Sequence, residues 1–188
     1  MVIIIVLLVI GFIFLAVIGV AAYGIITYNS FVTLRERVFN GKAQIAAQIE
    51  SRWDAVTNLI SATKQYESHE ASVLENITAQ RSSLGRDSSM DEIEQNDEQL
   101  NNVVGRLIAI SEAYPELKAS EVYKSTMESV NKFEDNVRHS RMIYNDVVTQ
   151  FNRKLRQFPT NIIAGIFKFE AQPYFEQTEQ KGEMPTWD

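Results

Sequence analysis

Hydrophobic positions follow two patterns along this chain: an unbroken run at the N-terminus, and a seven-residue repeat after it. From Val2 to Ile26 every residue is Val, Ile, Leu, Phe, Ala, Gly or Tyr, and the first charged residue is Arg35. As a helix this run reaches about 37 Å, more than the roughly 30 Å of a bilayer's hydrocarbon core. The run therefore predicts one transmembrane anchor in contact with the lipid bilayer, with anchor residues that include Val2, Leu8, Phe12, Phe14, Ile18 and Ile26.

A cleaved secretory signal is the alternative interpretation of this run, because Val20-Ala21-Ala22 has the small residues of a cleavage site. No Lys or Arg precedes the run, and the run is longer than the apolar part of a signal peptide, so we expect an uncleaved anchor. Arg35, Arg37 and Lys42 follow the span. This asymmetry predicts a single-pass protein of the cell membrane, with a short N-terminus outside and the bulk of the chain in the cytoplasm.

Beyond the anchor, apolar residues recur at sevens in three segments, which predicts long helices with one apolar stripe each. The first segment covers about residues 28–84. The second begins after Ser89, which forms a capping-box pair with Glu92, and ends before Pro115. The third extends from near Ser120 to Pro159.

These segments predict an all-α chain in which the transmembrane helix continues into a long antiparallel three-helix, coiled-coil-like bundle. We expect the anchor at residues 1–27, the bundle at 28–158 and a short helical and aromatic segment at 159–188. The aromatic residues of that last segment are expected to pack on the end of the third helix, and insertion into a membrane or a partner is the alternative. The final residues are polar and typical of a disordered terminus.

Helix lengths predict a surface that the chain itself does not cover. If short connections make neighbouring helices antiparallel, the second helix reaches only to about Leu59, and the third extends past the tip of the first. The uncovered stripe on the first helix then predicts a homo-oligomeric coiled coil. Its candidate interface residues are Phe31, Val38, Ile45, Ile49, Arg52 and Val56.

Charged residues interrupt the apolar stripes at several positions. Arg52 is expected either to lie at the rim with its charge in water, or to form a polar layer between protomers with Asp54 and Asn58. In the third segment, Glu134 and Arg141 fall on the stripe. We expect a polar cluster within the bundle, or else ordinary surface ion pairs, among Arg81, Glu94, Glu134 and Arg141.

Composition argues against several classes of function. The chain carries 18 basic and 24 acidic side chains, a net charge of −6, which does not favour nucleic-acid binding. His69-Glu70 begins like a zinc-protease motif, but Val73 stands where the second histidine would be. There is no cysteine, no glycine-rich phosphate loop and no paired nucleophile. We expect no metal, no cofactor and no enzymatic activity.

Several short motifs, in order along the chain, resemble the LemA family. They are Tyr28-Asn29-Ser30-Phe31-Val32, residues 52–59 (RWDAVTNL), Tyr66-Glu67-Ser68-His69-Glu70, residues 114–119 (YPELKA), Arg141-Met142-Ile143-Tyr144-Asn145, Phe151-Asn152 and Phe167-Lys168-Phe169. The chain departs from the family pattern at Ser51 and Thr57, where the family usually has a basic residue and a proline. The resemblance implies a bacterial single-pass membrane protein with a cytoplasmic helical bundle and no established enzymatic activity.

Together these features predict a membrane-anchored, non-enzymatic scaffold that self-associates at the cytoplasmic face and organises membrane or membrane proteins. The alternative is an adaptor that passes a signal to or from a membrane protease or sensor kinase. The expected partners are the lipid bilayer, other copies of the chain and a membrane protein, with no nucleic acid.

Overall fold

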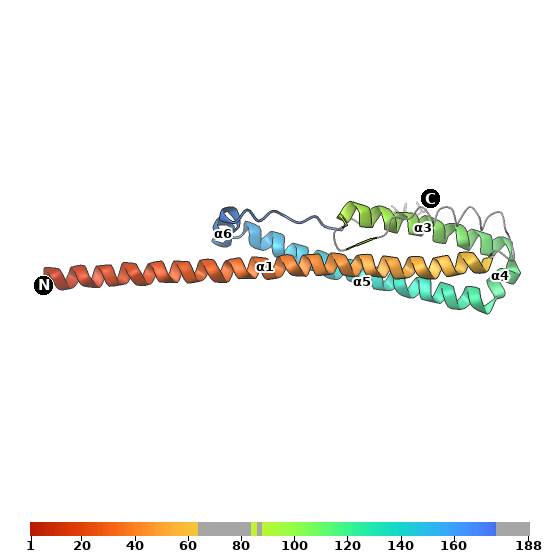
Figure 1. Ribbon diagram of the computed structural model, residues 1–188, viewed down its shortest axis with the longest axis horizontal. Helices are drawn as coiled ribbons and strands as arrows, with labels where there is room; N and C mark the ends of the chain where they lie inside the picture. Colours follow the sequence, from red (N-terminus) through yellow and green to blue (C-terminus); the bar gives the residue numbers. More distant parts are fainter. Residues whose placement is uncertain (64–83, 86–87, 176–188) are drawn as a thin grey trace, which may run out of the picture. The chain divides into compact units, whose positions relative to one another are not determined.

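A computed structural model describes residues 1–63, 84–85 and 88–175. Its elements are α1 (Val2–Thr63), α3 (Met90–Ala113), α4 (Pro115–Ala119), α5 (Glu121–Arg156) and α6 (Thr160–Ile166) (Figure 1). The described residues contain no strand, so the predicted all-α class is confirmed. The rest of the first predicted helix, residues 64–83, lies outside the described residues, as do residues 176–188 of the predicted C-terminal segment.

The ends of α3 follow the signals expected from the sequence. The Ser89 hydroxyl accepts a hydrogen bond from the Glu92 amide (3.2 Å), and the Ser89 amide donates to the Glu92 carboxylate (2.7 Å). This reciprocal pair satisfies two amides at the start of the helix. At the other end Tyr114 leaves the helical conformation, and Pro115 begins α4.

The hydrophobic run of α1 remains exposed. An 18-residue window of this helix has a mean hydropathy of 3.4, and none of the window is buried. The predicted anchor residues Phe12 and Ile26 are 74% and 69% exposed. In length and composition α1 is therefore fit to cross a membrane, and one unbroken helix carries both this run and the residues that follow it up to Thr63.

The chain forms two compact units. The first contains Met1–Asn40 and Asp146–Gln172, and the second contains Gly41–Asn145 and Pro173–Asp188. Helices α1 and α5 contribute residues to both units.

An aromatic core holds the first unit together. The Phe31 ring stacks on Phe169 with centroids 4.9 Å apart, and it meets the edge of Phe151 at 5.8 Å. Phe169 also lies edge-on to Phe151 at 6.3 Å. The C-terminal segment thus packs on α5 through Phe169, as expected, while Phe158 at the end of α5 stays 80% exposed.

In the second unit, α5 runs antiparallel to α1. A Cβ added at Gly41 would lie 3.3 Å from Tyr144 Cδ2, and farther along α1 Gln48 accepts a hydrogen bond from Asn136 (3.2 Å). The glycine that weakens the helix in isolation therefore permits a close approach of the two helices.

Helix α3 runs in the same direction as α1 in this unit, which corrects the predicted antiparallel order. Asp97 contacts Arg141, and Ser111 accepts a hydrogen bond from Tyr123 (2.7 Å), so α3 is antiparallel to α5. The expected level of the two helices is also wrong. The helix lengths placed the far end of the second helix beside about Leu59, whereas Trp53 donates a hydrogen bond to Asn96, near the start of α3. Heptad spacing marks which face of a helix is apolar, but it does not determine the direction or level of the neighbour.

The predicted oligomer interface is also wrong. Its six residues are all buried within this chain, with the largest exposed fraction, 5%, at Arg52. They are Phe31, Val38, Ile45, Ile49, Arg52 and Val56. The reason is that α5 lies along α1 in each unit and covers the apolar stripe of α1. These positions are not available to another copy.

Candidate functional site: a buried charge cluster and a C-terminal strap

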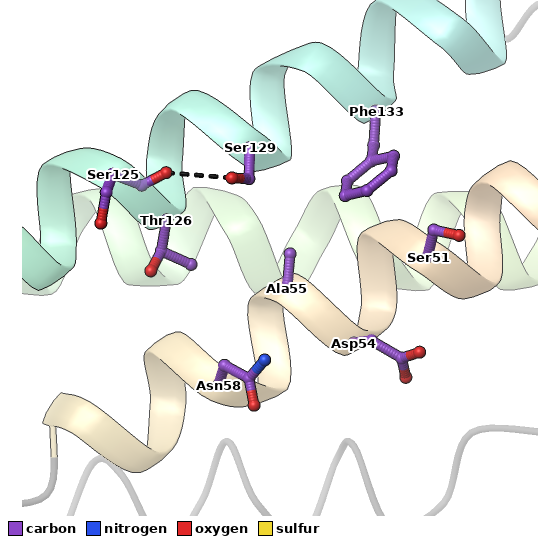
Figure 2. A pocket seen from close by; sticks show the side chains of 8 residues that line it. All are labelled: Ser51, Asp54, Ala55, Asn58, Ser125, Thr126, Ser129 and Phe133. Carbon is purple, nitrogen blue, oxygen red and sulfur yellow. Dashed lines mark hydrogen bonds between the residues drawn. The ribbon is translucent and has the colours of Figure 1, made fainter.

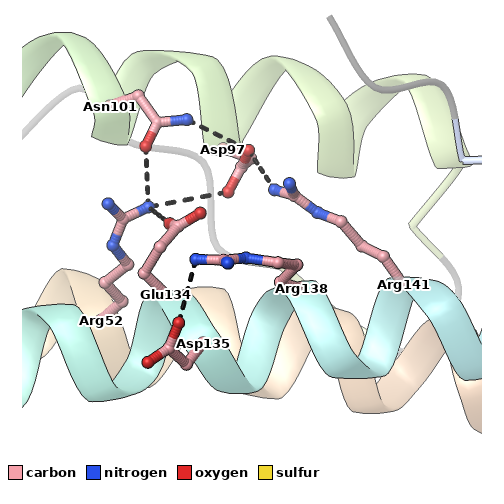
Figure 3. Close-up of polar contacts among 7 residues, drawn as sticks. All are labelled: Arg52, Asp97, Asn101, Glu134, Asp135, Arg138 and Arg141. Atoms are coloured by element: carbon pink, nitrogen blue, oxygen red, sulfur yellow. Dashed lines mark hydrogen bonds and ion pairs between the residues drawn. The ribbon is translucent and has the colours of Figure 1, made fainter. Parts of the chain in front are cut away.

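Three helices bring five polar side chains together inside the second unit (Figure 3). We call this set the charge cluster. It consists of Arg52 from α1, Asp97 and Asn101 from α3, and Glu134 and Arg141 from α5. Its two guanidinium groups and two carboxylates balance in charge.

Arg52 is the centre of the charge cluster. Its Nη1 atom lies 2.5 Å from Glu134 Oε2 and donates a hydrogen bond to Asn101 Oδ1 (2.8 Å). The same atom is 3.9 Å from Asp97 Oδ1. One guanidinium therefore contacts both of the other helices.

Asp97 connects Arg52 to the second arginine. Its Oδ2 atom accepts hydrogen bonds from Arg141 and from the Asn101 amide, the latter at 3.3 Å. Burial raises the pKa of Asp97, and the nearby Arg141 opposes that rise. Burial also lowers the pKa of Arg52, against the attraction of Glu134 and Asp97. For Asp97 and Arg52, burial disfavours the charged form, and the opposite charges of the cluster act against that effect.

The charge cluster contains residues for which the sequence predicted two different roles: Arg52 in an oligomer interface, and Glu134 and Arg141 in a polar cluster. Glu134 and Arg141 both belong to the charge cluster, Glu134 through its contact with Arg52 and Arg141 through its contact with Asp97. Arg52 itself was expected at a rim or between protomers. Asp97 and Asn101 were missed. Asp97 falls between Ile93 and Leu100 at helical spacings of four and three, so its place on the stripe was a usable signal.

The remaining members of the predicted polar cluster are Arg81 and Glu94. Arg81 is outside the described residues, so its place in the cluster stays a prediction. Glu94 acts on Tyr144, whose pKa rises to about 12 because of burial and then because of the Glu94 charge. The Tyr144 hydroxyl therefore remains a donor at neutral pH.

The second feature is an extended segment, residues 170–175, which we call the strap. In the second unit, the side chain of Asn145 pairs with the backbone of Phe175 in both directions. Asn145 Nδ2 donates to the Phe175 carbonyl (3.1 Å), and the Phe175 amide donates to Asn145 Oδ1 (2.9 Å). The Tyr144 hydroxyl donates to the Pro173 carbonyl (2.7 Å), and the Arg141 guanidinium lies 4.5 Å from the Phe175 ring centroid.

In the first unit, Asn152 holds the strap in the same way. It donates to the Gln172 carbonyl and accepts from the Gln172 amide, both at 2.9 Å. A side-chain amide offers one donor side and one acceptor side, so each asparagine takes the place of a neighbouring strand. The sequence motifs contained Asn145 and Asn152, but nothing in their spacing identified these partners.

A groove lies between α1 and α5 in the second unit (Figure 2). Its volume is about 470 Å³, and it is lined by Ser51, Asp54, Ala55, Asn58, Ser125, Thr126, Ser129 and Phe133. Asp54 and Asn58 thus line the groove, whereas Arg52 is buried in the charge cluster, so the predicted polar layer of these three residues does not form. The lining is mostly small and uncharged, with one carboxylate, Asp54.

These observations define a class: an all-α protein with an exposed apolar N-terminal helix that continues into a bundle. The sequence model of the LemA family matches residues 41–188, and the chain belongs to that family. The resemblance inferred from its motifs is therefore confirmed.

Named relatives are identical to this chain at about a quarter of the aligned positions. Magnetosome protein MamQ 2 of Paramagnetospirillum magneticum is 24% identical over 197 residues, covering 91% of this chain and 72% of the relative. Magnetosome protein MamQ of Magnetospirillum gryphiswaldense is 23% identical, covering 84% of this chain and 67% of the relative. Protein LemA of Metamycoplasma hominis is 27% identical over 137 residues, covering 72% of this chain and 63% of the relative.

The charge cluster predicts a large effect of Arg52→Ala. This change leaves Glu134 and Asp97 without one of their positive partners, and we expect unfolding to become easier by about 3 kcal/mol. The matched control is Arg138→Ala, because Arg138 pairs with Asp135 at 2.9 Å where both side chains are more than half exposed. That change should cost less than about 1 kcal/mol. Denaturant unfolding of the full chain in detergent, followed by circular dichroism, measures both, and equal losses would contradict the assignment.

The raised pKa of Tyr144 predicts a late titration. A tyrosine whose folded pKa of about 12 exceeds its ordinary value of 10.0 stabilises the fold below pH 10, and this contribution is lost as the pH rises through 12. In an ultraviolet titration of the folded chain, the Tyr144→Phe variant should lack an ionisation near pH 12 that the parent shows. A difference spectrum that titrates near pH 10 would show that this hydroxyl is not buried.

The strap predicts a specific effect of Asn145→Asp. The carboxylate keeps an acceptor for the Phe175 amide but replaces the donor with an oxygen that faces the Phe175 carbonyl. We expect the Phe175 amide to exchange with deuterium at least about tenfold faster, since the variant loses a hydrogen bond worth about 1 kcal/mol and its carboxylate also repels the Phe175 carbonyl. Asn161→Asp on α6, whose side chain is exposed, is the control. Unchanged exchange in Asn145→Asp would refute the pairing.

Proposed function

We propose that this protein is a non-enzymatic scaffold, anchored in the cell membrane by α1, that associates with other copies at the cytoplasmic face and organises membrane or membrane proteins. The observation that carries this proposal is the continuity of α1. A single helix contains the exposed apolar run and buried bundle residues as far as Ile60, so no separate linker follows the anchor.

The chemistry of the buried polar groups supports a structural role. The carboxylates of the charge cluster face arginines of the same chain, and the amides of Asn145 and Asn152 are engaged by the strap. These groups hold helices together and are not arranged as a general acid or base beside a substrate cavity. Two of the relatives are named as magnetosome proteins, and their names state no reaction, which agrees with this proposal.

An adaptor for a membrane protease or sensor kinase is the second candidate function. The groove between α1 and α5 favours it, because small side chains such as Ser125 and Ala55 allow a partner helix to approach closely. In this case the chain would act as a monomer or dimer on a different protein.

The mass of the native particle separates the two functions. The full chain extracted in mild detergent should form a large closed assembly of the 21.4 kDa subunit, visible by light scattering and electron microscopy. A monomer or dimer at every concentration would contradict the scaffold and favour the adaptor.

Cross-linking in native membranes provides a matched control. The chain has no cysteine, so single cysteines report on one position each. Ser125→Cys is exposed in the groove, whereas Val130→Cys on the same helix is fully buried. Oxidation should link neighbouring copies only from exposed positions. Links at Val130 alone would indicate unfolded protein and invalidate the mass result.

A further inference from the structure

Helix α6 and its flanking residues carry an apolar surface that the first unit does not cover. Phe158, Ile162, Ile166 and Phe167 are 80%, 53%, 65% and 52% exposed. The opposite side is packed, since Ala164 is only 2% exposed. Four large apolar side chains within ten residues form a patch that marks an interaction surface.

The location of this patch along α1 identifies its surroundings. A Cβ added at Gly24 would lie 3.8 Å from Ile163 Cδ1, and the Tyr28 and Phe167 rings have centroids 4.6 Å apart. Helix α6 therefore packs on α1 between Gly24 and Tyr28, where the apolar run ends at Ile26. When that run spans a bilayer, this level is the boundary between acyl chains and head groups.

The charges beside the patch have the sign that anionic lipids attract. Residues 153–170 contain four basic side chains and one acidic one, although the whole chain has a net charge of −6. The Lys154 ammonium turns inward, where it contacts Ser30 and lies 5.4 Å from the Phe31 ring. Arg153, Arg156 and Lys168 remain exposed. An apolar face with a basic fringe is typical of segments that lie in the membrane interface.

We propose that residues 158–167 form a second membrane contact in the bilayer that α1 crosses. Ile162, Ile166 and Phe158 insert among the upper acyl chains, and Arg153, Arg156 and Lys168 bind anionic head groups. This inference rests on the membrane anchor of the proposed function. A second copy of the chain would bind this patch less well than a bilayer. Its net negative charge attracts the basic residues beside the patch less strongly than an anionic lipid surface does.

Single labelled cysteines in the full chain test the proposal. A polarity-sensitive dye at Ile162→Cys should be quenched by lipids that carry a spin label near the head group, in vesicles that contain phosphatidylglycerol. The control is Val122→Cys on α5, which is exposed to a similar extent at 54% but belongs to the second unit. We expect at least about twofold stronger lipid quenching at position 162 than at 122, and weaker quenching by aqueous iodide.

Two further measurements keep the outcomes distinct. A dye at Phe12→Cys, with lipids that carry the spin label near the end of the acyl chain, reports whether α1 itself enters the bilayer, because position 12 lies near the middle of the apolar run. If position 12 is quenched by lipid and position 162 behaves like position 122, the inference is overturned and the anchor stands. If position 12 is not quenched, the anchor fails as well. Disulfide-linked dimers through Ile162→Cys, without lipid quenching, would assign the patch to a second copy and also overturn the inference.

The basic fringe is tested separately. The double variant Arg153→Gln/Arg156→Gln should lose most of the extra lipid quenching at position 162 when phosphatidylglycerol is present. In vesicles of phosphatidylcholine alone, the double variant and the parent should match. Equal quenching of both proteins in the two kinds of vesicle would overturn the assignment of these arginines to anionic head groups.

Discussion

Arg52 is a charge on the apolar face of α1, and the packing of the second unit depends on neutralising it. A guanidinium left alone in a buried position would cost several kcal/mol. Here Glu134 from α5 and Asn101 from α3 both reach the same nitrogen atom, and Asp97 links that contact to Arg141. Sliding either helix by one turn would leave a buried charge without its partner. The cluster therefore selects one alignment of three helices, which apolar heptads alone do not.

In the strap, buried backbone groups need partners in the same way as the buried charges of the cluster do. An extended segment outside a sheet has amides and carbonyls that need partners when it packs against a helix. Asn145 supplies a donor and an acceptor to Phe175, and Asn152 does the same for Gln172, so each unit pairs one residue of the strap with the two sides of an asparagine amide. Arg141 takes part in both devices, since it contacts Asp97 and covers the Phe175 ring. The motif from Arg141 to Asn145 thus joins the core of the bundle to the C-terminal segment.

Local structure could be predicted from this sequence because local signals determine it. The capping box at Ser89 and the proline after Tyr114 set the ends of α3, and the uncharged run ending at Ile26 set the anchor. Which helix covers which stripe could not be predicted in the same way. The heptads of α1 required a partner, but a second copy and α5 satisfy the same pattern, and only the three-dimensional path of the chain decides between them. The partners of Asn145 and Asn152 were also out of reach, because they are backbone atoms about thirty and twenty residues away that carry no side-chain signature.

The apolar stripe of α1 is buried within this chain. The exposed surfaces therefore differ from the stripe that the heptad pattern predicted as an interface. The described exposed apolar residues concentrate on the N-terminal run and around α6, and both belong to the first unit. The second unit instead offers a groove with small side chains and only one carboxylate, Asp54. A lipid surface binds exposed apolar side chains that have basic residues beside them. A protein partner binds more tightly where small side chains let it approach closely. The division of the chain into two units is therefore also a division of surface chemistry: the exposed apolar bulk and the basic fringe belong to the first unit, and the groove with small side chains belongs to the second.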